Sequence, residues 1–409
     1  MSTSIPLHQI KVVLLEGVHP EAGQILQQAG YTVEQYDHAM QDDALLDAAA
    51  DAHIVGIRSK SQLGPAYFEG ARRLWAVGCF CIGTNQVDLE AAAARGVAVF
   101  NAPFSNTRSV AEKTIAEIIA LQRRLFDRSM AMHQGMWSKS AAGAHEVRGL
   151  TLGIVGYGRI GSQLSVLAEA LGMQVIYHDV VDRLPLGNAQ VRNSLGDLLE
   201  QSDVVSLHVP ATNATRMLIG ERELAVMKPG AKLINNARGS VVDVDALAAA
   251  IRSGHIGGAS IDVFPEEPSA GKAEFDSPLR NMPNVILTPH IGGSTIEAQR
   301  NIAGEVSTKL VKLLNNGSTT TAVNMPEVEL PMLHEKHHRI LHVHHNVPGV
   351  LSKMHAIMGG LGVNVAAEHL QSDPQRSYVI LDVDPTHSES LEARLKQEVP
   401  ETIRCRSIW

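Results

Sequence analysis

The stretch that decides the fold is residues 151–161, TLGIVGYGRIG. Its apolar run ends at Gly156, and Gly158 and Gly161 complete a G-x-G-x-x-G spacing directly before a run of helical character, SQLSVLAEALG. The first glycine permits a tight turn, the second lets the backbone approach a ligand, and the third permits close packing of a helix on a strand. The next apolar run ends in a carboxylate, Asp179. This order predicts the opening strand, loop and helix of a Rossmann-type unit.

A strand, a glycine loop, a helix and an acid in this order also predict a dinucleotide site. The helix N-terminus, with Arg159 and Ile160 in its first turn, offers N–H groups and a positive dipole to a pyrophosphate. Asp179 is placed to accept hydrogen bonds from ribose hydroxyls and to repel the 2′-phosphate of NADP, so NAD is the expected cofactor. Arg183 could weaken that choice, although a solvated loop cation is the simpler interpretation.

The composition bounds the class of protein. With 409 residues, 44% of them hydrophobic, the chain can bury large cores and is expected to form two or three domains. A formal net charge of −8 without a long Lys/Arg run argues against a nucleic-acid partner. The three cysteines, Cys79, Cys81 and Cys405, do not make a disulfide framework, which indicates a reducing compartment. With no signal-peptide pattern and no apolar run of about 18 residues, we expect a cytoplasmic protein without a membrane partner.

The order of apolar and amphipathic runs predicts three structural regions. From Lys11 and again from Thr151, short apolar runs alternate with helical patterns, which is typical of parallel strands joined by crossover helices. A longer helix is expected from Ser109 to about Arg128, and a loop rich in Thr and Pro follows residue 317. After that loop, strands and helices are expected in the βαββαβ order of a ferredoxin-like unit.

Three further motifs supply the side chains that oxidation of a 2-hydroxy acid needs. They contain Arg238 in NNARGS, Glu267 in FPEEP and His290 in TPHIGGST, and each follows a predicted strand. A histidine can accept the hydroxyl proton, a carboxylate can hold that histidine and raise its pKa, and an arginine can bind a carboxylate and the developing carbonyl. Open α/β sheets place ligands at the carboxyl ends of their strands.

The order GYGRIG, NNARG, EEP and PHIGGSTIEAQ resembles the D-isomer-specific 2-hydroxyacid dehydrogenase family. The resemblance implies that Arg238 binds the substrate carboxylate and carbonyl, His290 is the acid/base and Glu267 orients it. Asp262 resembles the position near the nicotinamide carboxamide, with a structural acid at a strand end as the alternative. The resemblance also implies a Rossmann-type cofactor domain inserted in a flavodoxin-like substrate domain. The cofactor domain is expected at 103–293 and the substrate domain at 1–102 and 294–317. A linker is expected at 318–337 and a C-terminal domain at 338–409.

Two segments of the first region resemble substrate-binding segments of the family. HIVGIRSKSQL places two cations and a hydroxyl after a strand, where they could receive a phosphate or carboxylate: Arg58, Ser59 and Lys60. GCFCIGTNQ and NAPFSNTRS carry over Gly83 and Asn106, although Cys-Phe-Cys-Ile departs from the usual Ala-Gly before that glycine. MWSKSAAGAHE, with Trp137 and Lys139, resembles a segment that reaches a neighbouring active site, with a surface loop as the alternative.

The C-terminal region resembles an ACT regulatory domain through HVHHNVPGVL and GVNVAAEHL. Such a domain is typical of the family members that oxidise 3-phosphoglycerate to 3-phosphohydroxypyruvate and form tetramers. It implies L-serine as an effector, bound between two copies by His344, Asn346, Gly349 and Asn364. Side reduction of 2-oxoglutarate, another 2-hydroxy acid as substrate, and a dinucleotide-sensing scaffold similar to transcriptional corepressors are the alternatives. A metal site is a further, less favoured interpretation of six crowded histidines, His334, His337, His338, His342, His344 and His345, since no cysteine or carboxylate completes a compact set.

Overall fold

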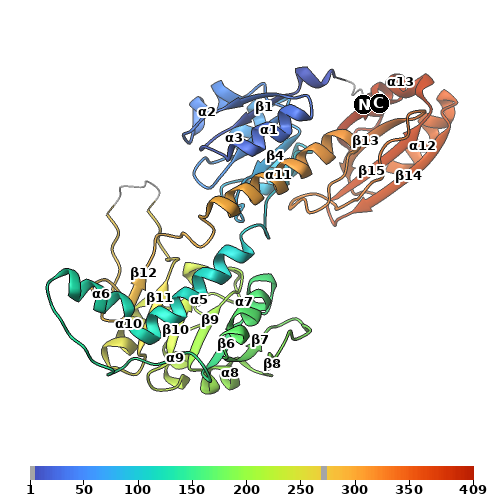
Figure 1. The fold of residues 1–409 in the computed structure, drawn as a ribbon. Helices are drawn as coiled ribbons and strands as arrows, with labels where there is room; N and C mark the ends of the chain where they lie inside the picture. Colours follow the sequence, from blue (N-terminus) through green and yellow to red (C-terminus); the bar gives the residue numbers. More distant parts are fainter. Residues whose placement is uncertain (1–4, 269–273) are drawn as a thin grey trace. The chain divides into compact units, whose positions relative to one another are not determined.

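The computed structural model describes residues 5–268 and 274–409. The chain forms two compact units, one from Met1–Ser105 with Gln299–Trp409 and the other from Asn106–Ala298. Each unit has a parallel sheet of its own, and the first unit carries an additional antiparallel sheet (Figure 1). No helix among the described residues has the length and apolar character that crossing a membrane requires.

The second unit is a doubly wound Rossmann-type fold. Its seven strands are all parallel, in the order β12-β11-β10-β9-β6-β7-β8. Their bounds are β6 (Thr151–Val155), β7 (Gln174–His178), β8 (Gln190–Val191), β9 (Val204–Leu207), β10 (Lys232–Asn235), β11 (Gly258–Ile261) and β12 (Val285–Leu287). The strand order reverses at β6, so the carboxyl ends of β6 and β9 flank the switch point at which such sheets bind ligands.

Two helices precede β6, and four others lie between later strands of this sheet. They are α5 (Thr107–Arg123), α6 (Leu125–His133), α7 (Arg159–Ala170), α8 (Leu195–Gln201), α9 (Glu221–Val226) and α10 (Val244–Arg252), with a 3₁₀ turn, η2 (Gly239–Val241). The central strands β9, β10 and β11 are buried along their whole length, as expected for a parallel sheet with both faces covered.

The first unit contains a five-stranded parallel sheet in the order β2-β1-β3-β4-β5. The strands are β1 (Lys11–Leu14), β2 (Thr32–Gln35), β3 (Ile54–Ile57), β4 (Ala76–Cys79) and β5 (Ala98–Phe100). The helices are η1 (Leu7–Gln9), α1 (Pro20–Gln28), α2 (Asp42–Ala49), α3 (Pro65–Gly70), α4 (Leu89–Ala94) and α11 (Ile296–Asn316). Val306 and Leu310 of α11 lie so close to Gly78 of β4 that a β-carbon there would clash with Val306.

The C-terminal segment has the βαββαβ order that the sequence predicts. Its elements are β13 (His338–His345), α12 (Val350–Leu361), β14 (Val365–Ser372), β15 (Arg376–Val383), η3 (Pro385–His387), α13 (Ser388–Glu398) and β16 (Thr402–Ile408). The four strands form an antiparallel sheet in the order β14-β15-β13-β16. Leu341, Val343 and Ile380 of this sheet share one hydrophobic cluster with the first sheet and α11, so the segment packs as part of the first unit.

Two local expectations differ from the structure. The single helix expected from Ser109 to Arg128 is two helices, because Arg124 adopts a left-handed conformation (φ 50°) and its N–H closes α5. The segment 318–337 contains no helix or strand, as expected, but it is not a free linker: Thr319 is fully buried, and Asn324 binds Val99 N–H and Val97 C=O of the β5 region. Because these contacts use side-chain amides and hydroxyls, they leave no hydrophobic period in the sequence.

Candidate active site

The glycine loop of the second unit connects β6 to α7 and is held beside the end of β7. Gly156 has a positive φ of 92°, and a β-carbon there would lie 2.7 Å from the carbonyl oxygen of His208. A β-carbon on Gly161 would lie 2.3 Å from the Gly156 carbonyl oxygen. Tyr157 N–H donates to Asp179 Oδ2 (2.7 Å), so the carboxylate at the end of β7 fixes the loop. Only glycine fits at positions 156 and 161, because a β-carbon at either would clash with a backbone carbonyl oxygen.

This loop fits the pyrophosphate of a dinucleotide. A β-carbon on Gly158 would meet nothing within 4 Å, so the backbone there lies against open space, and Gly158 is the N-cap of α7. Arg159 and Ile160 occupy the first turn of α7, where a helix presents N–H groups to anions. Arg183 lies 3.9 Å from Asp179 and is about half exposed, whereas the Asp179 carboxylate is hydrogen-bonded directly to the loop. Contact of these residues with NAD is a prediction that the geometry supports.

His290 and Glu267, the predicted acid/base and its orienting partner, form a hydrogen-bonded pair. His290 Nδ1 lies 2.8 Å from Glu267 Oε2, and Glu267 Oε1 accepts a hydrogen bond from Phe264 N–H (3.1 Å). The hydrogen bond to Glu267 raises the pKa of His290, burial opposes this, and the charge of Asp262 adds to the rise. Because Nδ1 is used by Glu267, Nε2 is the atom left to exchange a proton with a substrate.

Arg238 lies at the end of β10, beside the segment that carries Glu267. Its Nη1 donates to Ala237 C=O (2.8 Å), and its positive charge lowers the pKa of His290. The next residue, Gly239, passes so close to the Phe264 backbone that a β-carbon would lie 2.0 Å from it. This close approach holds the β10 and β11 loops together, and it brings Arg238, Glu267 and His290 into one cluster of charged groups.

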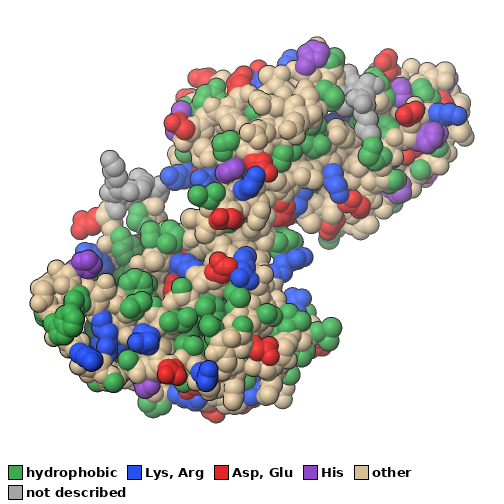
Figure 2. Space-filling model, in the orientation of Figure 1, with side chains coloured by type: hydrophobic (Ala, Val, Ile, Leu, Met, Phe, Trp, Pro, Cys, Tyr) green, Lys and Arg blue, Asp and Glu red, His purple; other side chains and the backbone are tan. Residues whose placement is uncertain are grey.

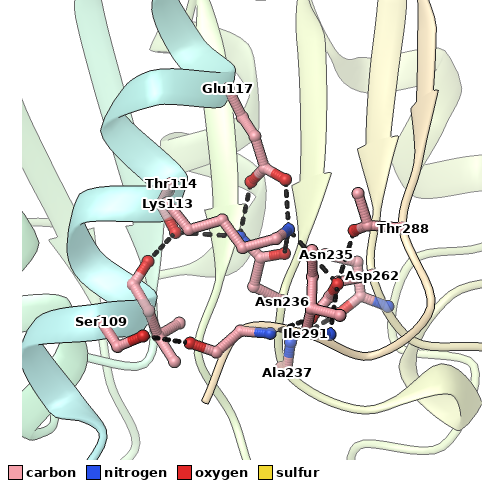
Figure 3. Close-up of polar contacts among 12 residues, drawn as sticks. Ser109, Lys113, Thr114, Glu117, Asn235, Asn236, Ala237, Asp262, Thr288 and Ile291 are labelled. Atoms are coloured by element: carbon pink, nitrogen blue, oxygen red, sulfur yellow. Dashed lines mark hydrogen bonds and ion pairs between the residues drawn. The ribbon is translucent and has the colours of Figure 1, made fainter. Parts of the chain in front are cut away.

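Asp262 organises the loop that carries His290 (Figure 3). Its carboxylate is 1% exposed and accepts hydrogen bonds from Thr288 Oγ1 (2.5 Å), Ile291 N–H (3.0 Å) and Gly292 N–H (2.8 Å). His290 N–H donates to the Asp262 backbone carbonyl (2.8 Å). These contacts give Asp262 the role of the structural acid at a strand end; its contact with the nicotinamide stays a prediction.

A buried ion-pair network behind Asp262 was missed by the sequence analysis (Figure 3). Lys113 of α5 contacts Glu117, Asn236 Oδ1 (3.0 Å) and Asp262 Oδ1 (3.4 Å). Glu117 in turn accepts from Asn236 Nδ2 (2.6 Å). The signal in the sequence was a lysine and a glutamate spaced i,i+4 on a helix, a pattern normally found on solvated faces. Here the network connects α5 to the ends of β10 and β11.

The predicted substrate-binding residues are divided between the two units. Arg58, Ser59 and Lys60 follow β3, and Gly83 follows β4, all in the first unit. Ser59 and Lys60 are exposed and Arg58 is partly exposed. Asn106 belongs to the second unit, as the N-cap residue of α5, and its Oδ1 is buried without a hydrogen-bond partner among the described residues.

The predicted effector residues lie at two ends of the C-terminal sheet. His344 is near the end of β13 with Ser377 as its partner on β15, Asn346 follows β13, and Gly349 is the N-cap of α12. Asn364 directly precedes Val365, whose partner on β15 is Val383. These two positions on β15, Ser377 and Val383, are six residues apart, which corresponds to about 20 Å of strand, so one chain does not bring Asn364 to the other three.

The histidine-rich stretch does not form a metal centre in the described part of the chain, where no group of three His, Cys, Asp or Glu side chains is suitably placed to hold an ion. His342 and His344 lie on the same face of β13, with stacked rings 5.2 Å apart, while His345 is exposed. Strand alternation therefore places His345 on the opposite face from His342 and His344.

Comparisons with known proteins identify the family to which the chain belongs. The profile of the D-isomer specific 2-hydroxyacid dehydrogenase, NAD binding domain, matches residues 115–292. The chain belongs to this family, and it is an oxidoreductase that uses NAD. It is 53% identical over 407 residues to D-3-phosphoglycerate dehydrogenase of Haemophilus influenzae and 50% identical over 408 residues to that of Escherichia coli K12, with 99% of each chain covered in both cases. The D-lactate dehydrogenase of Aquifex aeolicus, solved with NAD and lactic acid, has a TM-score of 0.67 and 29% identity, covering 77% of this chain and 100% of that one.

Proposed function

We propose that the chain oxidises D-3-phosphoglycerate to 3-phosphohydroxypyruvate with NAD. The observation that carries the proposal is the His290–Glu267 pair, 2.8 Å apart, with Arg238 beside it at the strand ends of a sheet that also carries the glycine loop. The substrate is supported by the name of the relatives that match over 99% of their length and by two cations, Arg58 and Lys60, after β3.

Each residue of the site has one proposed role in the reaction. NAD, when bound, would accept the hydride. Nε2 of neutral His290 accepts the proton of the substrate hydroxyl, and the resulting imidazolium is stabilised by Glu267 through Nδ1. Arg238 binds the substrate carboxylate and the oxygen that becomes the carbonyl, and Arg58 and Lys60 receive the phosphate. Oxidation requires neutral His290, so its rate rises with pH through the raised pKa of that residue, whereas reduction requires the imidazolium and falls.

A panel of substrates tests the proposal. Initial rates of NADH oxidation are measured with 3-phosphohydroxypyruvate, hydroxypyruvate, pyruvate, glyoxylate and 2-oxoglutarate, with NADPH as the comparison cofactor. The proposal expects the highest kcat/KM for 3-phosphohydroxypyruvate with NADH. A higher value for an unphosphorylated acid would assign another substrate, a significant rate with 2-oxoglutarate would establish the side reaction, and no turnover with any of them would favour a dinucleotide-sensing scaffold.

The C-terminal βαββαβ segment is proposed to be an ACT domain that binds L-serine between two copies of the chain. His344 is 3% exposed and its Nδ1 has no hydrogen-bond partner among the described residues, so a buried polar atom is available at this end of the sheet. Gly349, with φ 92°, begins α12, whose N-terminus can receive a carboxylate. Because Asn364 lies at the other end of the sheet, a site that uses all four residues requires a second copy.

Complementation between two variants tests that arrangement. Asn346→Ala and Asn364→Ala should each weaken L-serine inhibition, while Asn213→Ala, exposed in the other unit, should not. When the two variants are co-expressed, a mixed pair contains one site with both asparagines intact, so inhibition should be partly restored. Failure of wild type to respond to L-serine would refute the effector, and failure of the mixed pair would refute a site shared between copies.

Two separate surfaces support a homotetramer. Figure 2 shows hydrophobic side chains gathered over the region of the second unit where Figure 1 labels α6, and α6 and the following arm expose Leu125, Phe126, Met130, Met132, Met136 and Trp137. Trp137 is 82% exposed, and Lys139 is exposed two residues later. In the first unit, β14 is an edge strand that pairs only with β15 in the described structure. Two different self-complementary contacts per chain close as a tetramer, which light scattering would measure.

A further inference from the structure

The Arg58–Lys60 segment is held in place by two buried polar side chains that carry no assigned role. The order β2-β1-β3-β4-β5 reverses between β1 and β3, which is the ligand-binding switch point of a flavodoxin-like sheet. Arg58 follows β3 on one side of this point, and Glu16 follows β1 on the other. Gln86 lies in the loop after β4. Three neighbouring strand ends therefore meet around the cations predicted to bind phosphate.

Glu16 fixes the second half of the segment through its backbone. Its Oε1 accepts a hydrogen bond from Ser61 N–H (2.8 Å), and its Oε2 accepts one from Lys60 N–H (3.0 Å). Glu16 is only 8% exposed and has a φ of +63°, a conformation that costs free energy in a residue with a side chain. A buried carboxylate in this conformation, with both oxygens used by one loop, is suited to holding that loop rather than to binding a ligand.

Gln86 fixes the first half and connects it to the second predicted substrate segment. It is 6% exposed, and its Nε2 donates to Arg58 C=O (2.5 Å) and to Gly83 C=O (3.3 Å). The one amide thus spans the loop after β3 and the loop after β4. Ser61, which is fully buried, adds a third contact because its Oγ accepts from Met40 N–H (3.2 Å).

We propose that Glu16 and Gln86 are positioning residues that make the enzyme select a phosphorylated substrate. This inference rests on the proposed phosphate-binding role of Arg58 and Lys60. Two like charges close together repel each other, and long side chains lose rotamer entropy when they bind. Because Glu16 and Gln86 fix the backbone at Lys60 and Arg58, the loop that carries both cations is set before the phosphate arrives. Neither Glu16 nor Gln86 needs to contact the substrate for this effect.

The test separates phosphate binding from catalysis. Glu16→Gln places an amide donor against the N–H group of Lys60 or Ser61, and Gln86→Leu removes both carbonyl contacts at nearly the same side-chain size. For each variant, KM for 3-phosphohydroxypyruvate should rise about tenfold, the scale of one or two hydrogen bonds, whereas KM for hydroxypyruvate and both kcat values should change less than about twofold. A structural defect would instead change both substrates together.

Glu34→Gln is the matched control, because Glu34 lies on the adjacent β2 and pairs with Lys11 (3.2 Å), away from the segment. It should leave every KM unchanged. Thermal unfolding confirms folding, and if Glu16→Gln does not fold, Gln86→Leu gives the result. An unchanged KM for the phosphorylated substrate, or equal losses for both substrates, would overturn the inference.

A further variant distinguishes this inference from the proposed function on which it rests. Arg58→Met combined with Lys60→Met should raise KM for 3-phosphohydroxypyruvate more than either positioning variant does. If this double variant leaves that KM unchanged, the phosphate site itself is wrong. If it raises KM while Glu16→Gln and Gln86→Leu do not, the phosphate site stands and only the positioning role is refuted.

Discussion

His290 in the second unit and His342 in the C-terminal sheet are histidines whose pKa values are shifted in opposite directions. His290 is about half exposed and hydrogen-bonded to Glu267, which raises its pKa. His342 is fully buried on β13 and bonded to the neutral Thr402 hydroxyl (2.8 Å), and burial lowers its pKa to about 3. A neighbouring carboxylate thus prepares one histidine to exchange protons near neutral pH, whereas burial keeps the other neutral.

This difference shows why residue type alone does not identify a catalytic histidine in a chain with 19 of them. The partner of the Nδ1 atom decides whether the pKa of a histidine is raised or lowered. In His290 that partner is a carboxylate, and in His342 the Nδ1 atom is buried without a partner among the described residues. The following predictions test the comparison, beginning with the largest expected effect.

His290→Asn should lower kcat for both reaction directions by about 10² to 10⁴, the usual contribution of a general acid/base. Asparagine cannot exchange the proton, but the glycine loop at the end of β6 is untouched, so NADH affinity measured by fluorescence titration should be nearly unchanged. His345→Asn, at an exposed position of β13, is the control and should keep full activity. Near-normal turnover of the His290 variant would mean that the acid/base has been assigned wrongly.

His342 should make the folded protein sensitive to acid. Its folded-state pKa of about 3 lies below the ordinary value of 6.5, so the unfolded chain binds the proton more readily and stability falls as pH decreases below 6.5. Between pH 6.5 and 5 this amounts to about 2 kcal/mol. His342→Leu should lose this part of the pH dependence in urea unfolding curves, whereas His345→Gln should keep it. Identical pH dependence of wild type and His342→Leu would contradict the comparison.

Glu267→Gln should lower kcat about tenfold and move the pH profile. Because Glu267 is the largest cause of the raised pKa of His290, its loss lowers that pKa, and the midpoint of the oxidation profile moves to lower pH. The reduction profile, which needs the imidazolium, should lose activity at a lower pH than wild type. The measurement is the pH profile of kcat/KM in both directions. A midpoint that does not move would mean that the group titrating in the profile is not His290.

Lys113→Met should produce a smaller shift in the opposite direction. Asp262 raises the pKa of His290, and Lys113, 3.4 Å from Asp262, offsets part of that negative charge. Without the cation, the midpoint should rise by a few tenths of a pH unit. Arg108→Met is the matched control, because Arg108 forms an exposed i,i+4 pair with Glu112 on the same helix. A shift to lower pH, or an equal shift in the control, would show that the buried network does not act through Asp262.

The sequence by itself determined the elements whose signals are local. The glycines at 156, 158 and 161 require a turn and close approaches that side chains forbid, and the structure has these features at Gly156 and Gly161. The parallel sheets and the βαββαβ order also followed from hydrophobic periodicity, because a strand and a helix bury different spacings of side chains. Arg238, Glu267 and His290 were placed at strand ends, and the structure brings them together.

Only the tertiary structure decided which polar groups meet across distant parts of the chain. The Lys113 network and the contacts of Glu16 and Gln86 join residues from different strand ends and helices, and nothing in their sequence spacing records the pairing. The same holds for segment 318–337, which the sequence describes as a linker and the structure packs against β5. Hydrophobic burial leaves a period in the sequence, whereas a buried hydrogen bond depends on two atoms coming within about 3 Å, a condition that only the folded chain sets.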